Sequence, residues 1–101
     1  MATIKVAQSI GKTLNTRFEG KKLYNEIVQA LKKDKFALID MENVEMATQG
    51  FADESIGKLV KQLGWDNFKK HIQFQNTSKK NKNIIEYVVV RRCSELSPKR
   101  S

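Results

Sequence analysis

The clearest pattern in the chain is a short apolar run followed by helical spacing, within residues 36–64. Residues 36–41 are mostly apolar, which is typical of a buried β-strand. After a loop at 42–47, small and apolar residues recur as on one face of an α-helix: Ala52, Ser55, Ile56, Leu59, Val60 and Leu63. Thr48 is placed to cap the start of this helix, and Gly64 stands where a helix commonly ends.

Patterns of the same kind predict further elements on the N-terminal side of this unit. Apolar and polar residues alternate within residues 1–8, which indicates an outer strand, and a second short strand is expected at 13–17. Gly20 is expected to break the chain before a helix at 21–33, where apolar residues again have helical spacing.

The C-terminal part contains one segment that fits two structures. Residues 65–70 are expected to form a connector, and 71–75 alternate as a strand does. At 84–92, the many Ile, Tyr and Val residues favour a strand by propensity, whereas the spacing of the apolar residues also fits a helix. A helix here would be capped by Thr77 or Ser78.

The order strand, helix, strand, helix, strand predicts an α/β layer. Its last two strands should pair in parallel through a right-handed crossover. A length of 101 residues suits one domain, expected at 1–96 and followed by a disordered tail at 97–101.

Composition indicates a soluble protein rather than a membrane or secreted one. No apolar run approaches the roughly 20 residues that span a bilayer, and the N-terminus lacks the pattern of a signal peptide. Cys93 is the single cysteine, so no disulfide can form within the chain. We therefore expect a cytoplasmic protein with no membrane partner.

The formal net charge is +8, from 19 Lys and Arg against 11 Asp and Glu. Such a balance favours nucleic acid or another anionic partner. However, no Lys or Arg lies between Lys35 and Lys58, whereas five acids do: Asp40, Glu42, Glu45, Asp53 and Glu54. The turn before the second long helix is therefore predicted to be an acidic surface on a basic protein.

The residues that could take part in catalysis have no suitable partners at catalytic or metal-binding spacing in the sequence. His71 and Cys93 have no companions at the spacing of metal ligands, and the five glycines form no phosphate-binding loop. Asp53 and Glu54 are adjacent, but neighbouring helix positions project about 100° apart. We predict no catalytic residue, no metal ligand and no cofactor, and a protein that is not an enzyme.

The strand, loop and helix described first also carry a family resemblance. The residues concerned are Ile39-Asp40, Val44, Thr48-Gln49-Gly50-Phe51, Asp53-Glu54, Gly57-Lys58-Leu59 and Leu63-Gly64. Together they resemble STAS-like domains of unknown function, relatives of the anti-sigma factor antagonists, over roughly residues 4–92. The resemblance implies a small single α/β domain with a mixed or parallel sheet and helices mainly on one face. It also places a terminal helix at 84–92, which we predict in preference to a strand.

The antagonists that this chain resembles carry a serine in the corresponding turn. A partner kinase of the histidine-kinase ATPase fold phosphorylates that serine and so breaks the complex. Gln49 occupies its position here and cannot accept phosphate. Thr48 is then either a displaced phosphoacceptor or only a helix cap.

The first functional hypothesis is a regulatory protein-binding module that docks its partner through the acidic turn. The resemblance implies an ATPase of the histidine-kinase fold as that partner. The predicted contact residues are Asp40, Val44, Met46, Thr48, Gln49, Phe51, Asp53 and Glu54. Phe51 or Met46, if exposed, would be an apolar anchor ringed by acids; alternatively, Phe51 starts the core face of the helix.

The alternative hypothesis is a nucleic-acid-binding domain that uses the basic C-terminal half. Its candidate contacts are Lys69, Lys70, Lys79, Lys80, Lys82, Arg91 and Arg92. Binding of this kind would weaken steeply with salt.

Overall fold

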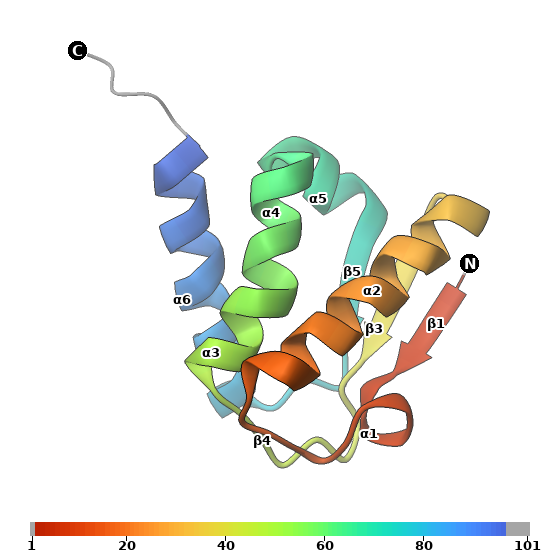
Figure 1. Ribbon diagram of the computed structural model, residues 1–101, viewed down its shortest axis with the longest axis vertical. Helices are drawn as coiled ribbons and strands as arrows, with labels where there is room; N and C mark the ends of the chain where they lie inside the picture. The colour runs from red at the N-terminus through yellow and green to blue at the C-terminus, as the bar shows by residue number, and fades with distance from the viewer. Residues whose placement is uncertain (1, 97–101) are drawn as a thin grey trace.

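The computed structural model describes residues 2–96 and builds them into an open sheet packed against helices (Figure 1). The main sheet has three parallel strands in the order β1-β3-β5: β1 (Ala2–Lys5), β3 (Ala37–Asp40) and β5 (Ile72–Gln75). In the central strand, Ile39 is paired with Ile4 on one side and Phe74 on the other. A smaller parallel pair joins β2 (Thr13–Leu14) to β4 (Met46–Ala47).

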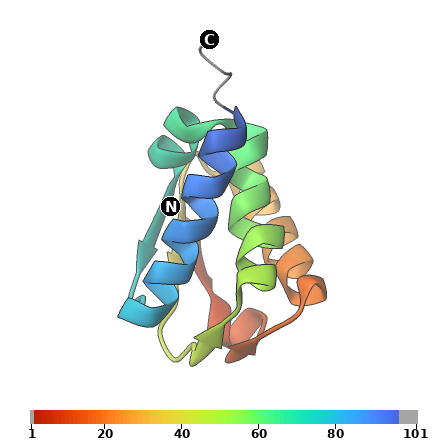
Figure 2. The same ribbon diagram turned by 90° about the vertical axis from the view of Figure 1, so that its left-hand side faces the viewer.

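The helical elements follow the strands in the α/β order that the sequence predicts. They are α1 (Val6–Ser9), α2 (Arg17–Lys33), α3 (Gln49–Ala52), a π-helical turn η1 (Asp53–Gly57), α4 (Lys58–Leu63), α5 (Trp65–His71) and α6 (Lys79–Leu96). Elements α3, η1 and α4 follow one another without a break, and α2, α4 and α6 run side by side (Figures 1 and 2).

Burial along the strands shows that the helices cover mainly one face of the sheet. Ile4, Ile39 and Ile72 are buried beneath the helices, whereas their strand neighbours Thr3 and Gln73 are exposed. Successive strand residues point to opposite faces, so this alternation confirms the predicted α/β architecture. Within residues 2–96, no helix is long and apolar enough to cross a membrane.

Gly20 does not break the chain as predicted, because it lies inside α2. The helix begins earlier, where Thr16 and Glu19 form a capping box in which each side chain bonds the backbone N–H of the other residue. A Cβ at Gly20 would lie 2.7 Å from the carbonyl oxygen of Phe51. The glycine therefore serves the close approach of α2 to the following helix rather than a turn.

Four other boundaries differ from the sequence prediction. The strand predicted at 1–8 ends at Lys5, and the one at 13–17 is only the two residues of β2. The predicted loop at 42–47 contains β4, because that segment pairs with β2. The predicted connector at 65–70 is α5, whose Trp65 and Phe68 rings stack 5.9 Å apart.

The segment with two possible structures is helical, as predicted. Ile85 and Val88 on α6 are buried against the rest of the domain. The backbone N–H of Asn81 donates to Ser78 Oγ at 3.2 Å, so Ser78 rather than Thr77 caps this helix. The tail predicted at 97–101 lies outside the described residues.

Replacing Gly57 with alanine should lower the free energy of unfolding by about 2 kcal/mol, since the new methyl group overpacks a helix contact. A Cβ at Gly57 would lie 2.7 Å from Val88 Cγ1 and 2.8 Å from Asp53 Oδ1. The matched control is Gly50→Ala, where the nearest atom would be Arg17 Cγ at 3.8 Å and no loss is expected. Urea unfolding of both variants checks this, and equal stability would contradict the close packing at η1.

Candidate functional site

The acidic turn, defined here as residues 40–54, starts from a buried carboxylate at the end of β3. Asp40 is only 6% exposed. It accepts hydrogen bonds from the backbone N–H of Glu42 at 3.0 Å, from Gln75 Nε2 at 3.1 Å and from Asn76 Nδ2 at 3.0 Å. Asp40 therefore ties the ends of β3 and β5 to the first residues of the turn.

These donors favour the ionised carboxylate, and the pKa of Asp40 lies below its ordinary value of 3.8, chiefly through Asn76 and the Glu42 amide. A lowered folded-state pKa contributes stability that is present above the unfolded-state value and lost as the pH falls through the folded-state value. The free energy of unfolding should therefore decline as the pH is lowered below about 4, and less steeply in Asp40→Asn. Urea titrations at several acidic pH values test this. Identical slopes for the two proteins would contradict it, and Glu42→Gln is the neighbouring control.

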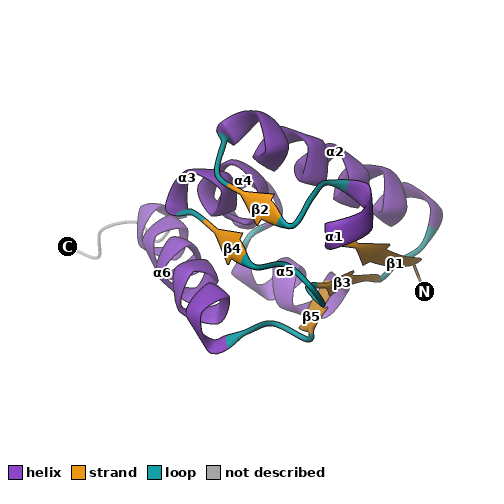
Figure 3. Ribbon diagram, turned by 90° about the horizontal axis from the view of Figure 1, so that it is seen from below, coloured by secondary structure: helices purple, strands orange, loops and turns teal. Residues whose placement is uncertain are grey.

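The middle of the turn is held by a buried side chain from α6. Asn81 is 1% exposed; its Oδ1 accepts from the backbone N–H of Ala47 at 3.1 Å, and its Nδ2 donates to the carbonyl oxygen of Val44 at 3.3 Å. On the other side, the N–H of Thr48 donates to the carbonyl oxygen of Leu14 at 2.9 Å. The turn is thus fixed from both sides, by the Asn81 side chain and by the pairing of β4 with β2, which lie side by side in Figure 3.

Thr48 caps α3 as predicted. Its Oγ1 accepts from the backbone N–H of Phe51 at 3.4 Å, and its O–H donates to the carbonyl oxygen of Leu14 at 3.4 Å. Phe51 is 2% exposed and starts the core face of the helix, and Val44 is also buried. Asp40, Val44 and Phe51, which we predicted as contact residues, are therefore interior residues that shape the turn.

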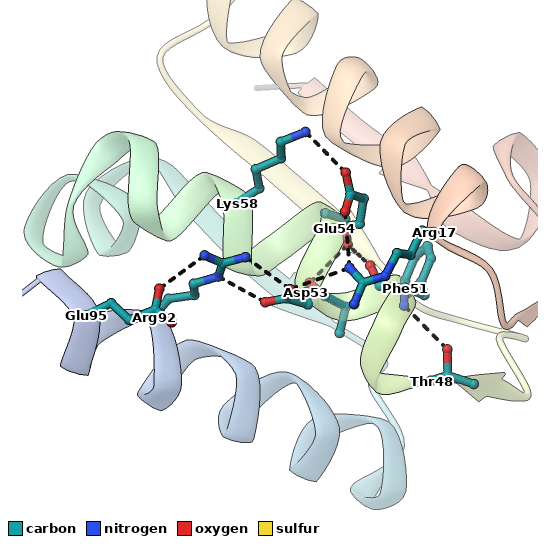
Figure 4. Close-up of polar contacts among 10 residues, drawn as sticks. Arg17, Thr48, Phe51, Asp53, Glu54, Lys58, Arg92 and Glu95 are labelled. Atoms are coloured by element: carbon teal, nitrogen blue, oxygen red, sulfur yellow. Dashed lines mark hydrogen bonds and ion pairs between the residues drawn. The ribbon is translucent and has the colours of Figure 1, made fainter.

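Asp53 and Glu54 belong to an ion-pair cluster that joins three helices (Figure 4). Arg92 on α6 binds Asp53 in a bidentate manner, with Nε 2.9 Å from Oδ1 and Nη2 3.0 Å from Oδ2. Arg17 Nη1 on α2 and Lys58 Nζ each lie 3.2 Å from a carboxylate oxygen of Glu54. The pKa of Glu54 is accordingly lowered, first by the Lys58 hydrogen bond, and that of Arg92 is raised by Asp53.

The cluster neutralises two acids that the sequence assigns to the partner surface. What remains exposed in the turn is a smaller set: Glu42, Asn43, Glu45, Met46 and Gln49. Met46 is 36% exposed, and neither Glu42 nor Glu45 forms an ion pair with another described residue. Nothing in the local sequence distinguishes these acids from the paired ones, because the cations come from distant helices.

The basic candidates are distributed over two helices. Lys69 and Lys70 lie on α5, the three lysines at 79, 80 and 82 lie in the first turn of α6, and Arg91 lies near its other end. Two of these cations lie over aromatic rings: Lys69 Nζ is 5.3 Å from the Trp65 ring centroid, and the Arg91 guanidinium is 6.0 Å from the Tyr87 ring centroid. Arg92 is occupied by Asp53 and is not available to a nucleic acid.

The structure also shows the surroundings of His71 and Cys93, the two residues that stand isolated in the sequence. His71 Nδ1 lies 2.6 Å from the carbonyl oxygen of Lys35. Burial raises the pKa of the half-buried Cys93 thiol, so it is held protonated. Among residues 2–96, no group of three or more His, Cys, Asp or Glu side chains is placed to hold a metal ion.

The chain matches a known protein family. A family described as a STAS-like domain of unknown function matches residues 19–82, which is more than half of the chain. The matched span runs from the first turn of α2 to the first turn of α6 and contains the whole acidic turn. No curated protein and no solved structure matches the chain.

Proposed function

Because the chain belongs to the family of STAS-like domains of unknown function, we propose that it is a non-enzymatic, regulatory protein-binding module. Its docking surface is the exposed part of the acidic turn, with the half-buried Thr48 beside it: Glu42, Asn43, Glu45, Met46 and Gln49. The shape of this surface is held by the other predicted contact residues, which are Asp40, Val44, Phe51, Asp53 and Glu54. The partner has a basic patch around an apolar pocket, and the family resemblance implies an ATPase of the histidine-kinase fold.

The observation that carries this proposal is an exposed methionine on a rigid backbone. Asn81 binds the backbone on both sides of Met46, at Val44 and at Ala47. A loop that is already ordered loses little conformational entropy on binding, so more of the contact energy appears as affinity. Exposed apolar side chains surrounded by charged residues are common at protein interfaces. The apolar side chain makes the main contact, and the charges attract the partner.

The turn is proposed to act without a phosphorylation switch. Gln49 stands where the family resemblance places the acceptor serine, and a glutamine amide cannot be phosphorylated. The Thr48 hydroxyl is engaged by the Phe51 amide and the Leu14 carbonyl. The exposed carboxylates Glu42 and Glu45 supply constant negative charge on the same turn.

The test is capture of protein partners by the tagged domain from nuclease-treated lysate of its own source. Glu42→Lys with Glu45→Lys should reduce capture about tenfold without changing the melting temperature, because both side chains are exposed and unpaired among the described residues. The matched control reverses Glu26 and Asp66 on α2 and α5 and should capture as the wild type does. The proposal fails if the double reversal in the turn retains the same proteins at the same level.

A nucleic-acid-binding function is the second candidate, favoured by the net charge of +8 and six basic side chains in the C-terminal half: Lys69, Lys70, Lys79, Lys80, Lys82 and Arg91. It requires binding to mixed oligonucleotides that weakens steeply between low and physiological salt. Absence of such binding at low salt rejects it.

A further inference from the structure

A second surface lies on the opposite side of α6 from the ion-pair cluster and plays no part in the function proposed above. A groove of about 1360 Å³ runs between β5 and α6 and is closed at one end by α5. Its walls are largely apolar and include Trp65, Phe74, Ile85, Val89 and Cys93. Its size exceeds the roughly 300–1,000 Å³ of most small-molecule pockets, which indicates a larger occupant.

One wall of the groove is the free edge of β5, which among residues 2–96 pairs with β3 alone. The carbonyl oxygen of Gln75 accepts from the N–H of Met41, so the backbone groups of Gln75 face β3. Because backbone groups alternate along a parallel strand, those of Phe74 face outward, away from β3. The four-residue strand Ile-Gln-Phe-Gln contains neither a charged residue nor a proline, two features that often protect an exposed edge.

We propose that this groove binds an extended acidic peptide segment of a protein partner, which pairs with the free edge of β5 and continues the sheet. An added strand lies about 4.8 Å from its neighbour, which places it between β5 and α6. Alternate side chains of the peptide then contact the apolar residues Ile85 and Val89 on α6. Backbone pairing supplies affinity, and the apolar wall selects the side chains.

The charged residues that line the groove favour a negatively charged occupant. Lys69 on α5 and Lys82 in the first turn of α6 line opposite ends of the groove, and Glu86 is the acid that lines it. The charged residues that line the groove are therefore two lysines and one glutamate. An acidic segment is attracted by this rim, whereas a second copy of a chain with net charge +8 is repelled.

Two residues that occur once in the chain report directly on this groove. Trp65 is the only tryptophan and Cys93 the only cysteine, and both line it. The probe is an acetylated, amidated peptide of about seven residues that alternates Asp or Glu with Val or Ile. A matched peptide carries Lys at the acidic positions. Binding is followed by Trp65 fluorescence and by protection of Cys93 from a maleimide reagent.

The acidic peptide is expected to shift Trp65 emission, to protect Cys93 and to bind about tenfold more tightly than the basic one. Lys69→Glu with Lys82→Glu should weaken binding about tenfold, whereas the control Lys21→Glu with Lys32→Glu on α2 should not. N-methylation of alternate peptide residues should abolish binding in one register only, since only one set of N–H groups faces β5. This last comparison leaves the protein unchanged and so cannot reflect misfolding.

Three results would overturn the proposal. The first is no protection of Cys93 at about 1 mM acidic peptide. The second is protection by a mixed oligonucleotide of about 20 nucleotides and not by the peptide, which would assign the groove to nucleic acid. The third is protection that rises with protein concentration alone, together with a dimer by sedimentation. Each of these leaves the docking role of the acidic turn unaffected, because the charge reversals in that turn lie outside the groove.

Discussion

Reversing the charge of both Asp53 and Glu54 is expected to destabilise the domain by roughly 3 kcal/mol, because both acids belong to partly buried ion pairs. Asp53 is held by both nitrogen positions of the Arg92 fork, and its side chain is 21% exposed. A lysine at position 53 would face Arg92 and Arg17 with no acid between them. Arg92 would keep only the more exposed Glu95 as a counterion, and a partly buried lysine at 53 would have none, which is costlier than a lost surface pair.

Thermal and urea unfolding measure this effect without reference to any partner. The control is the double reversal of Glu42 and Glu45, which are exposed in the same turn and should change stability by no more than about 0.5 kcal/mol each. If the reversal at 53 and 54 proves as mild as this control, the cluster is a surface feature. Loss of partner capture in that variant would then be direct evidence of docking rather than of unfolding.

The sequence alone would lead to the opposite expectation for these two acids. They stand in a stretch of 22 residues without Lys or Arg, which correctly indicates an acidic segment. Their partners Arg17 and Arg92 lie 37 and 39 positions away and are brought in by α2 and α6. No local pattern carries such information, because a charge run looks the same whether the fold leaves it free or pairs it.

Elements fixed by local chemistry are predicted well from sequence, and those fixed by packing are not. The apolar strand β3, the Thr48 cap and the helix end at Gly64 all follow from residue type and spacing. Gly20 is a case of the second kind, since a glycine that breaks a helix and one that lets two helices approach have the same local sequence. The same limit explains β4, which exists only because β2 lies beside it.

The choice of helix for α6 shows what a resemblance adds to propensity. Ile, Tyr and Val favour a strand, yet Ile85, Val88 and Val89 present one face to the rest of the domain only in a helix. Tertiary burial therefore overrides local preference in this segment. The helix then supplies three features that its sequence does not announce: Asn81 under the turn, Arg92 on Asp53, and one wall of the groove beside β5.

Replacing Asn81 with alanine is expected to cost about 3 kcal/mol, because it leaves two buried backbone groups of the acidic turn without partners. The N–H of Ala47 would lose its acceptor and the carbonyl oxygen of Val44 its donor. Each orphaned group costs about 1–3 kcal/mol where water cannot replace the lost bond. Asn81→Asp should lower the stability less than Asn81→Ala, since one carboxylate oxygen can still accept from the N–H of Ala47.

The matched control is Asn83→Ala, two residues further along the same helix, where the side chain is exposed and a change within about 0.5 kcal/mol is expected. Urea unfolding gives the stabilities, and amide hydrogen exchange at Ala47 reports the turn itself. If exchange at Ala47 accelerates far more than global unfolding allows, the turn opens locally and partner capture should fall with it. If Asn81→Ala is as stable as Asn83→Ala, the turn does not depend on α6, and the rigid backbone proposed for docking is lost as an argument.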